Sequence, residues 1–124
     1  MVGYVTLGTN DLKRATEFYD ALLGELGAKQ FMNDGRIVAW GGDAGAAMLA
    51  VCTPFDEGVA TVGNGVMVAL DAGSQELVKK LHAKALQLGA SDEGEPGPRG
   101  DGGFYGGYFR DFDGNKLAAF CFGA

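Results

Sequence analysis

Few side chains in this sequence have the types and spacing that enzyme chemistry requires. His82 is the one histidine, and we expect it at the surface or boundary of a helix in preference to a ligand role. No Gly-x-Ser-x-Gly segment supplies a nucleophile for it. Cys52 and Cys121 both lie inside apolar runs, where a thiol is usually an inert core side chain. We expect both thiols to be reduced, in preference to a disulfide between them, and to face the helices. The residues therefore indicate neither a serine triad nor a catalytic thiolate.

The charged residues beside glycines are typical of turns. Asp101, Asp111 and Asp113 all lie in such segments, so they do not predict a paired-carboxylate site. Arg99 lies in a loop of sequence GEPGPRGDGG, and two readings of it stay open. It is either a solvated loop charge or a clamp that closes over an anionic ligand.

The overall charge excludes several classes of partner. The formal net charge of −6 disfavours nucleic acid and anionic membrane surfaces, which bind clustered cations. No apolar run approaches the roughly 18 residues of a membrane span. The N-terminus, MVGYVTLGTNDLKR, lacks the basic and apolar regions of a signal peptide, so we expect a cytoplasmic protein.

The elements that must position any site are clearest at the C-terminal end. The segment YGGYFRDFDGNKLAAFCF, residues 105–122, predicts a strand, a tight turn at 113–115 and a second strand. The second strand, 117–122, is apolar at every position, which indicates that both of its faces are covered. Helices can cover one face, so the other needs a cavity, a ligand or another sheet.

The rest of the chain predicts the same kind of unit twice. In the first half we expect a strand at 3–8, a helix at 11–26 capped by Asn10 or Thr9 and ended by Gly27, strands at 29–33, 36–41 and 46–53, and turns at 34–35 and 42–45. In the second half we expect a strand at 66–70, a helix from the cap Ser74 to Gly89, a short strand beginning at 90–92, a Gly/Pro loop at 94–103 and the final hairpin. The chain then contains a βαβββ module at 1–53, a linker at 54–64 and a second module at 65–124, forming one structural domain.

Three segments, in this order and at these separations, resemble the vicinal oxygen chelate superfamily. They are VTLGTNDLKRATEFYDALLGELGA, NGVMVAL and YFRDFDGNKLAAF. That superfamily includes glyoxalase I, bleomycin-resistance proteins, fosfomycin-resistance transferases and extradiol dioxygenases. The resemblance implies an α+β fold, in which two βαβββ modules form a curled mixed-sheet cup with the helices outside. Members often dimerise, so it also implies a homodimer.

Enzymes of the superfamily hold a divalent metal through His, Gln or Glu on the first and last strands of each module. The resemblance carries those ligand positions onto Tyr4, Leu49, Met67 and Ala118. None of these is a suitable ligand, since a neutral phenol and a thioether bind such ions poorly and Leu and Ala have no donor atom. The resemblance therefore implies a member with no metal and no other cofactor.

The same resemblance indicates which side chains line the cup. If Tyr4 and Ala118 face inward, strand alternation places Thr6 and Phe120 beside them. Tyr108 matches a pocket tyrosine of the fosfomycin-resistance proteins. The candidate binding residues are Tyr4, Thr6, Trp40, Leu49, Met67, Arg99, Tyr108, Ala118 and Phe120.

Three functions follow from this set. The first is binding of a small apolar or aromatic molecule in a metal-free cup, with hydroxyls from Tyr4, Thr6 and Tyr108. The alternative is a glyoxalase-type lyase or isomerase that uses Tyr4 or Tyr108 as acid and base, or an unidentified metal site. The third is a dimeric interaction module whose bulky cup residues fill the space as core. No catalytic residue is assigned.

Overall fold

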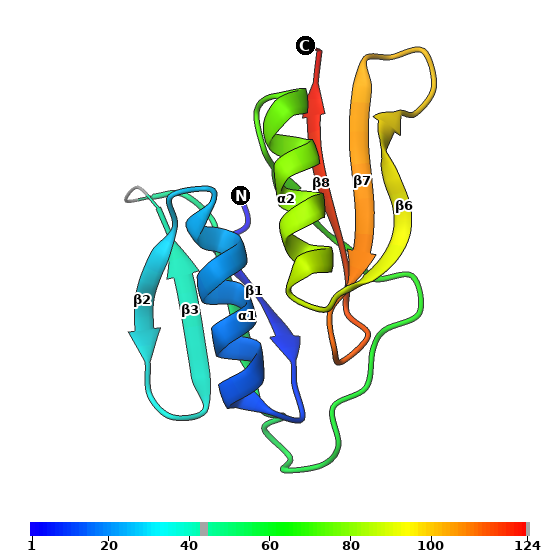
Figure 1. Ribbon diagram of the computed structural model, residues 1–124. Helices are drawn as coiled ribbons and strands as arrows, with labels where there is room; N and C mark the ends of the chain where they lie inside the picture. The colour runs from blue at the N-terminus through cyan, green and yellow to red at the C-terminus, as the bar shows by residue number, and fades with distance from the viewer. Residues whose placement is uncertain (43–44, 124) are drawn as a thin grey trace. The chain divides into compact units, whose positions relative to one another are not determined.

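A computed structural model describes residues 1–42 and 45–123 of the chain (Figure 1). The chain divides into two compact units, Met1–Val62 and Gly63–Ala124. The turn expected at 42–45 includes residues 43 and 44, which lie outside the described residues.

The first unit is a four-stranded mixed sheet with one helix. Its elements are β1 (Tyr4–Gly8), α1 (Leu12–Gly24), β2 (Lys29–Asn33), β3 (Ile37–Gly41) and β4 (Met48–Cys52). The strand order is β1-β4-β3-β2. β1 runs parallel to β4, while β3 runs antiparallel to both of its neighbours. This is the predicted βαβββ order.

Helix α1 forms because its apolar residues recur at helical spacing. Its buried side chains are Ala15, Phe18, Tyr19, Leu22 and Leu23, and they pack on β2, β3 and β4. The predicted cap is wrong by one or two residues: Asp11 is the N-cap, and its side chain accepts from the amide of Arg14. Gly27 has a φ of +78°, which glycine adopts readily after a helix.

The predicted cap residue Asn10 instead binds the segment that follows β4. Its Nδ2 donates to the carbonyl of Ala60 over 3.1 Å, and its Oδ1 accepts from the amide of Ala60 over 2.7 Å. The Ala60 side chain is buried. Part of the expected linker is therefore fastened to the first unit.

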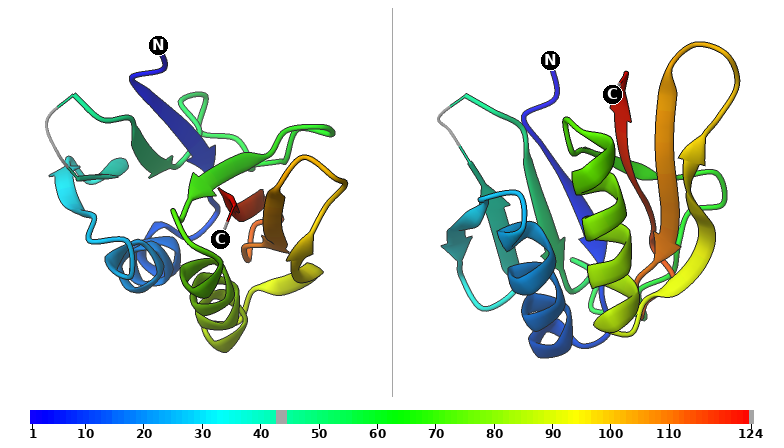
Figure 2. Two further views of the ribbon diagram at one scale, coloured as in Figure 1. Left: turned by 90° about the horizontal axis from the view of Figure 1, so that it is seen from above. Right: turned by 45° about the horizontal axis from the view of Figure 1, so that its top comes forward.

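The second unit repeats the arrangement. Its elements are β5 (Val68–Asp71), α2 (Gln75–Gln87), β6 (Ser91–Pro98), β7 (Phe104–Arg110) and β8 (Lys116–Phe122). The strand order is β5-β8-β7-β6, with β5 parallel to β8. Figure 2 shows each helix lying along one face of the sheet of its own unit. Ser74 caps α2 as expected, through its hydroxyl and the amide of Leu77.

Strand β6 is longer than the sequence predicts. It extends through residues 94–98, which we expected to be loop, and contains Pro96 and Pro98. Proline has no backbone N–H to donate. Because β6 is an edge strand, a proline whose nitrogen faces away from β7 breaks no hydrogen bond between strands. Two register shifts, between Asp92 and Gly94 and between Gly94 and Gly97, accommodate the irregular sequence.

Both units thus confirm the α+β class and the βαβββ pattern of mixed sheets. That the two sheets curl around one shared cup stays a prediction.

Candidate functional site

The open face of the first sheet carries most of the exposed candidate residues of that unit. We call the face of each sheet opposite its own helix the open face. Pairing in register places Tyr4 beside Met48, and places Thr6, Ala50 and Ala39 in one row. Tyr4 is 65% exposed, and Thr6 is also exposed. Both side chains lie on the open face of the sheet, and that this face lines a cup stays a prediction.

A hollow of about 270 Å³ lies on this face. Seven side chains line it: Tyr4, Phe31, Met32, Ile37, Ala39, Met48 and Ala50. Tyr4 carries the one hydroxyl of this set, and the other six side chains are apolar. Such a lining suits a small apolar or aromatic molecule.

Trp40 and Leu49 lie on the opposite, helix-covered face, which corrects their expected place in the cup. They are a register pair, 2% and 6% exposed. Trp40 packs against Tyr19 of α1, and its Nε1 donates to Oδ1 of Asp20 over 2.7 Å. The strands β3 and β4 are apolar at nearly every position, so alternation alone does not reveal which side faces the helix.

The same register corrects the expected orientation of Cys52. It pairs with Gly8 and Ile37, two residues along β4 from Ala50, and so lies on the open face and not toward the helix. Cys121 lies on the helix-covered face of the second sheet, next to Tyr105. Both thiols are free.

The open face of the second sheet brings together Tyr108, Ala118, Phe120 and Arg99. Tyr108 pairs with Ala118, which pairs with Ala69 of β5. Ala118 is fully buried beneath its neighbours, whereas Tyr108 and Phe120 are half-buried. Met67 precedes β5 and is 43% exposed.

Two cations lie over the ring of Tyr108. The Cζ atom of Arg99 is 5.3 Å from the ring centroid, and the Nζ atom of Lys116 is 5.4 Å from it. The sequence reasoning missed Lys116. Alternation on β8 could have found it, because it lies two residues from Ala118 on the same face.

Aromatic side chains extend the same face toward the end of β8. The rings of Phe104 and Phe120 stack at 5.6 Å, and Phe122 meets both edge-on. Phe122 is 68% exposed. This part of the face is apolar and offers aromatic surface to a ligand.

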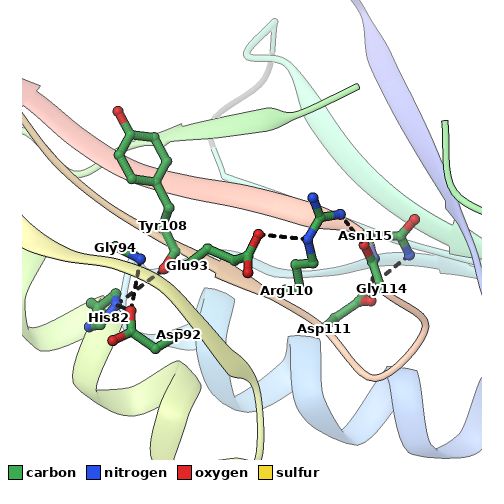
Figure 3. A network of polar contacts seen from close by, with 9 residues as sticks. All are labelled: His82, Asp92, Glu93, Gly94, Tyr108, Arg110, Asp111, Gly114 and Asn115. Carbon is green, nitrogen blue, oxygen red and sulfur yellow. Dashed lines mark hydrogen bonds and ion pairs between the residues drawn. The ribbon is translucent and has the colours of Figure 1, made fainter. Parts of the chain in front are cut away.

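A polar contact from α2 reaches the backbone of Tyr108 (Figure 3). From α2, the Nε2 atom of the buried His82 lies 3.0 Å from Asp92 and 3.2 Å from the carbonyl of Tyr108. We expected His82 at the helix surface or boundary, and it is instead part of the helix–sheet contact. The amide of Gly94 donates to the Asp92 carboxylate and, with the hydrogen bond from His82, lowers the pKa of that group.

Further along β7, Arg110 and Asp111 fix the final turn. Arg110 pairs with Glu93 over 2.8 Å and donates to the carbonyl of Gly114. The Asp111 carboxylate accepts from the side chain and the amide of Asn115 (Figure 3). These aspartate and arginine residues are structural, as the sequence indicates for Asp111.

The residues at the metal-ligand positions do not fit a divalent ion. Leu49 points toward α1, Ala118 has no donor, and Met67 has only a thioether. The neighbours of Leu49 that do reach the open face, Met48 and Ala50, add no hard donor. Within residues 1–42 and 45–123, no three His, Cys, Asp or Glu side chains are grouped closely enough to hold a metal ion.

The fold and these faces define a class of small proteins built from two βαβββ modules with ligand-sized apolar surface on the sheets. The chain belongs to the glyoxalase/bleomycin resistance protein/dioxygenase superfamily, whose family model matches residues 1–119. The resemblance seen in the sequence is thereby confirmed.

Solved structures show the same fold. A glyoxalase/bleomycin resistance protein from Albidiferax ferrireducens T118 is 34% identical, with 98% of each chain covered and a TM-score of 0.88. A lactoylglutathione lyase from Agrobacterium tumefaciens is 21% identical, with 98% of this chain and 92% of that chain covered and a TM-score of 0.69. A fosfomycin resistance protein from Listeria monocytogenes is 17% identical, with the same coverage and a TM-score of 0.71.

A comparison with curated protein sequences finds no match. Neither helix in the described ranges is long and apolar enough to cross a membrane.

Proposed function

We propose that this protein binds a small, largely apolar or aromatic molecule on the open faces of its sheets, without a metal ion. The observation that carries the proposal is the hollow of about 270 Å³ lined by Tyr4 and six apolar side chains. Its volume is close to the lower end of small-molecule pockets, roughly 300 Å³. Tyr4 and Thr6 supply hydroxyls on the open face of the first sheet, and Tyr108 supplies one on the open face of the second. The protein acts by sequestration or as a carrier.

The donor chemistry supports the metal-free part of the proposal. The positions that hold a metal in related enzymes carry Tyr4, Met67, Ala118 and apolar residues of β4. A hard divalent ion prefers carboxylate or imidazole donors, which these positions lack. Binding therefore rests on apolar contact and hydroxyls.

Filling the hollow tests the proposal. Ala39 lines the hollow, so Ala39→Leu adds three heavy atoms beside the space that a ligand would occupy. A panel of apolar and aromatic compounds is screened for an increase in melting temperature of the wild-type protein. We expect hits, and we expect Ala39→Leu to weaken them at least about tenfold because the added side chain overlaps the ligand.

Lys13→Leu is the matched control, because it adds the same side chain on the exposed side of α1. It should leave ligand affinity unchanged. No stabilising compound in a broad panel, or equal affinity in Ala39→Leu and wild type, would contradict binding in the hollow.

A second candidate is a glyoxalase-type lyase or isomerase, favoured by the position of Tyr4. Tyr4 has the one side-chain hydroxyl among the lining residues, so it is the side chain suited to exchange a proton with a bound molecule. If the protein shows such an activity, Tyr4→Phe and Tyr108→Phe will identify the acid and base. Unchanged turnover in both variants would remove the tyrosine mechanism.

We also propose a cytoplasmic homodimer. Two free thiols suit a reducing compartment, and the exposed aromatic side chains Phe31 and Phe122, 73% and 68% exposed, suit burial against a second copy. Members of the superfamily often dimerise, which supports the same assembly.

A further inference from the structure

The two cations on the open face of the second sheet are held in place without being neutralised. Arg99 and Lys116 both lie within 5.4 Å of the Tyr108 ring centroid. The ring is electron-rich on its face, so it attracts both cations and restricts where they lie. Neither contact cancels a positive charge.

Missing side chains on β6 make room for the guanidinium of Arg99. A Cβ on Gly94 would lie 3.4 Å from Nη2 of Arg99 and 3.0 Å from the Tyr108 ring, and a Cβ on Gly97 would lie 3.1 Å from Nη1. Arg99 therefore lies back along β6 over two glycines, beside Tyr108. Its Nη2 donates to the carbonyl of Glu95 over 2.7 Å, which fixes the plane of the group.

A carboxylate neutralises the neighbouring cation Arg110 but not these two. Arg110, two residues along β7 from Tyr108, pairs with Glu93 over 2.8 Å. Within the described ranges, the side-chain hydrogen bonds of Arg99 go to the backbone carbonyls of Glu95 and Pro98, and neither Arg99 nor Lys116 forms an ion pair with Asp or Glu. In a chain with net charge −6, two such charges on one ring are a local excess of positive charge.

We propose that Arg99 and Lys116 bind the anionic group of a ligand on the open face of the second sheet, and that this ligand is an apolar or aromatic acid. The guanidinium provides donors in a fixed plane that suits a carboxylate or phosphonate, and Lys116 adds a second charge. Tyr108 and the stacked Phe104 and Phe120 offer aromatic surface to the apolar body. This inference rests on the proposed function and specifies its ligand class.

Three matched probes test it: phenylacetate, phenylacetamide and phenylphosphonate. The first two have almost the same shape and differ in charge, and the third carries a different anionic group. Affinities are measured on the full chain by titration, followed through backbone amide NMR signals, including those of Gly94 and Gly97. We expect both anions to bind about tenfold or more tightly than the neutral amide, the preference that a hydrogen bond to a charged group confers.

Two charge-removing variants assign the preference to these residues. Arg99→Gln and Lys116→Gln keep polar side chains and should each lower the affinity for phenylacetate about tenfold while leaving that for phenylacetamide unchanged. Arg36→Gln is the matched control, because Arg36 also lies over an aromatic ring, that of Phe55 at 5.6 Å, but in the first unit. It should change neither affinity.

The outcomes separate this inference from the proposed function. Equal binding of phenylacetate and phenylacetamide would overturn the anion site while leaving small-molecule binding intact. The same conclusion follows if the anion preference survives in the Arg99→Gln/Lys116→Gln double variant. Binding of none of the probes, together with an empty stabilisation panel, would overturn both.

Discussion

Asp111 stabilises the turn of the final hairpin through its carboxylate. It is 7% exposed, and it accepts hydrogen bonds from the amides of Asp113 and Asn115 and from the Asn115 side chain. The donors lie on a turn with Gly114 at a φ of +88°, which glycine adopts readily. The turn connects the two strands that carry Tyr108 and Lys116, so its geometry determines how those side chains meet.

We predict that Asp111→Ala lowers the free energy of unfolding by about 3 kcal/mol, because it leaves several partly buried donors without an acceptor. Asp111→Asn keeps one acceptor oxygen and should cost less. Urea denaturation of each variant measures the effect. Asp101→Ala, in the exposed loop before β7, is the control and should leave stability unchanged. A loss in Asp111→Ala no larger than in the control would contradict this role.

Asp92 contributes stability that depends on pH. Hydrogen bonds from the Gly94 amide and from His82 lower its pKa below the ordinary value of 3.8. A group with a lower pKa in the folded state adds stability above the pKa of the unfolded state, and this stability disappears as the pH falls through the folded pKa. The contribution is therefore complete at neutral pH and decreases below about pH 4.

We predict that Asp92→Asn reduces the loss of melting temperature between neutral pH and about pH 3, since the amide does not titrate. Asp71→Asn is the control: Asp71 also accepts from a backbone amide two residues on, but makes no contact with a histidine. The prediction fails if the melting temperature of Asp92→Asn falls with pH as steeply as that of the wild-type protein.

At the scale of the elements, periodicity predicted the helices and most strands. The stripe that includes Phe18 and Leu22 and the cap Ser74 are local signals, so they were sufficient for α1 and α2. Which side chains of β3 and β4 face the helix could not be predicted. Both sides of these strands are apolar, so the orientation depends on pairing with residues distant in the sequence. For this reason Trp40 was placed in the cup, although Asp20 and Tyr19 hold it against α1.

The position of Trp40 predicts how the single tryptophan of this chain behaves. It is 2% exposed and hydrogen-bonded to Asp20. We expect its fluorescence to resist quenching by iodide and to change little when a ligand binds on the open face. Ala39→Trp in a Trp40→Phe background places the fluorophore in the hollow and serves as the positive control. Strong quenching of wild-type fluorescence by a bound ligand would contradict the assignment of Trp40 to the helix-covered face.

The side chain of Asn10 holds the segment after β4 against the first unit. Asn10 makes two hydrogen bonds to the backbone of Ala60, and a Cβ on Gly8 would lie 3.1 Å from the Ala60 side chain. We predict that Asn10→Ala increases hydrogen exchange across residues 54–62 while protection in the strands persists, because the two hydrogen bonds to the backbone of Ala60 are lost. Exchange measured by mass spectrometry checks this. Asn33→Ala, which removes a contact within an exposed turn, should leave the segment unchanged.

At the scale of the whole molecule, the repeat explains why family membership was predictable while the chemistry was not. A module of one helix and four strands needs correct apolar spacing over the whole chain, and that spacing is visible in the sequence. The site depends on a few side chains, and the pairing of the strands determines on which face of the sheet each of them lies. The resemblance indicated Tyr4 and Tyr108, and alternation placed Thr6 beside Tyr4 and could have placed Lys116 beside Ala118. Met48 and Ala39 became candidates only once the register was known.

The last prediction concerns the composition of the native assembly. We expect native mass spectrometry of the untagged protein, purified without chelators, to show a dimer of the 12.9 kDa chain without a divalent ion. The absence of a metal follows from the donor set, in which the family's ligand positions hold Tyr4, Met67 and Ala118. A co-purified adduct should be a small acid whose release by high salt reflects the charges of Arg99 and Lys116. About one divalent ion per chain would mean that other groups form a metal site, and enzymatic chemistry would then become the leading hypothesis.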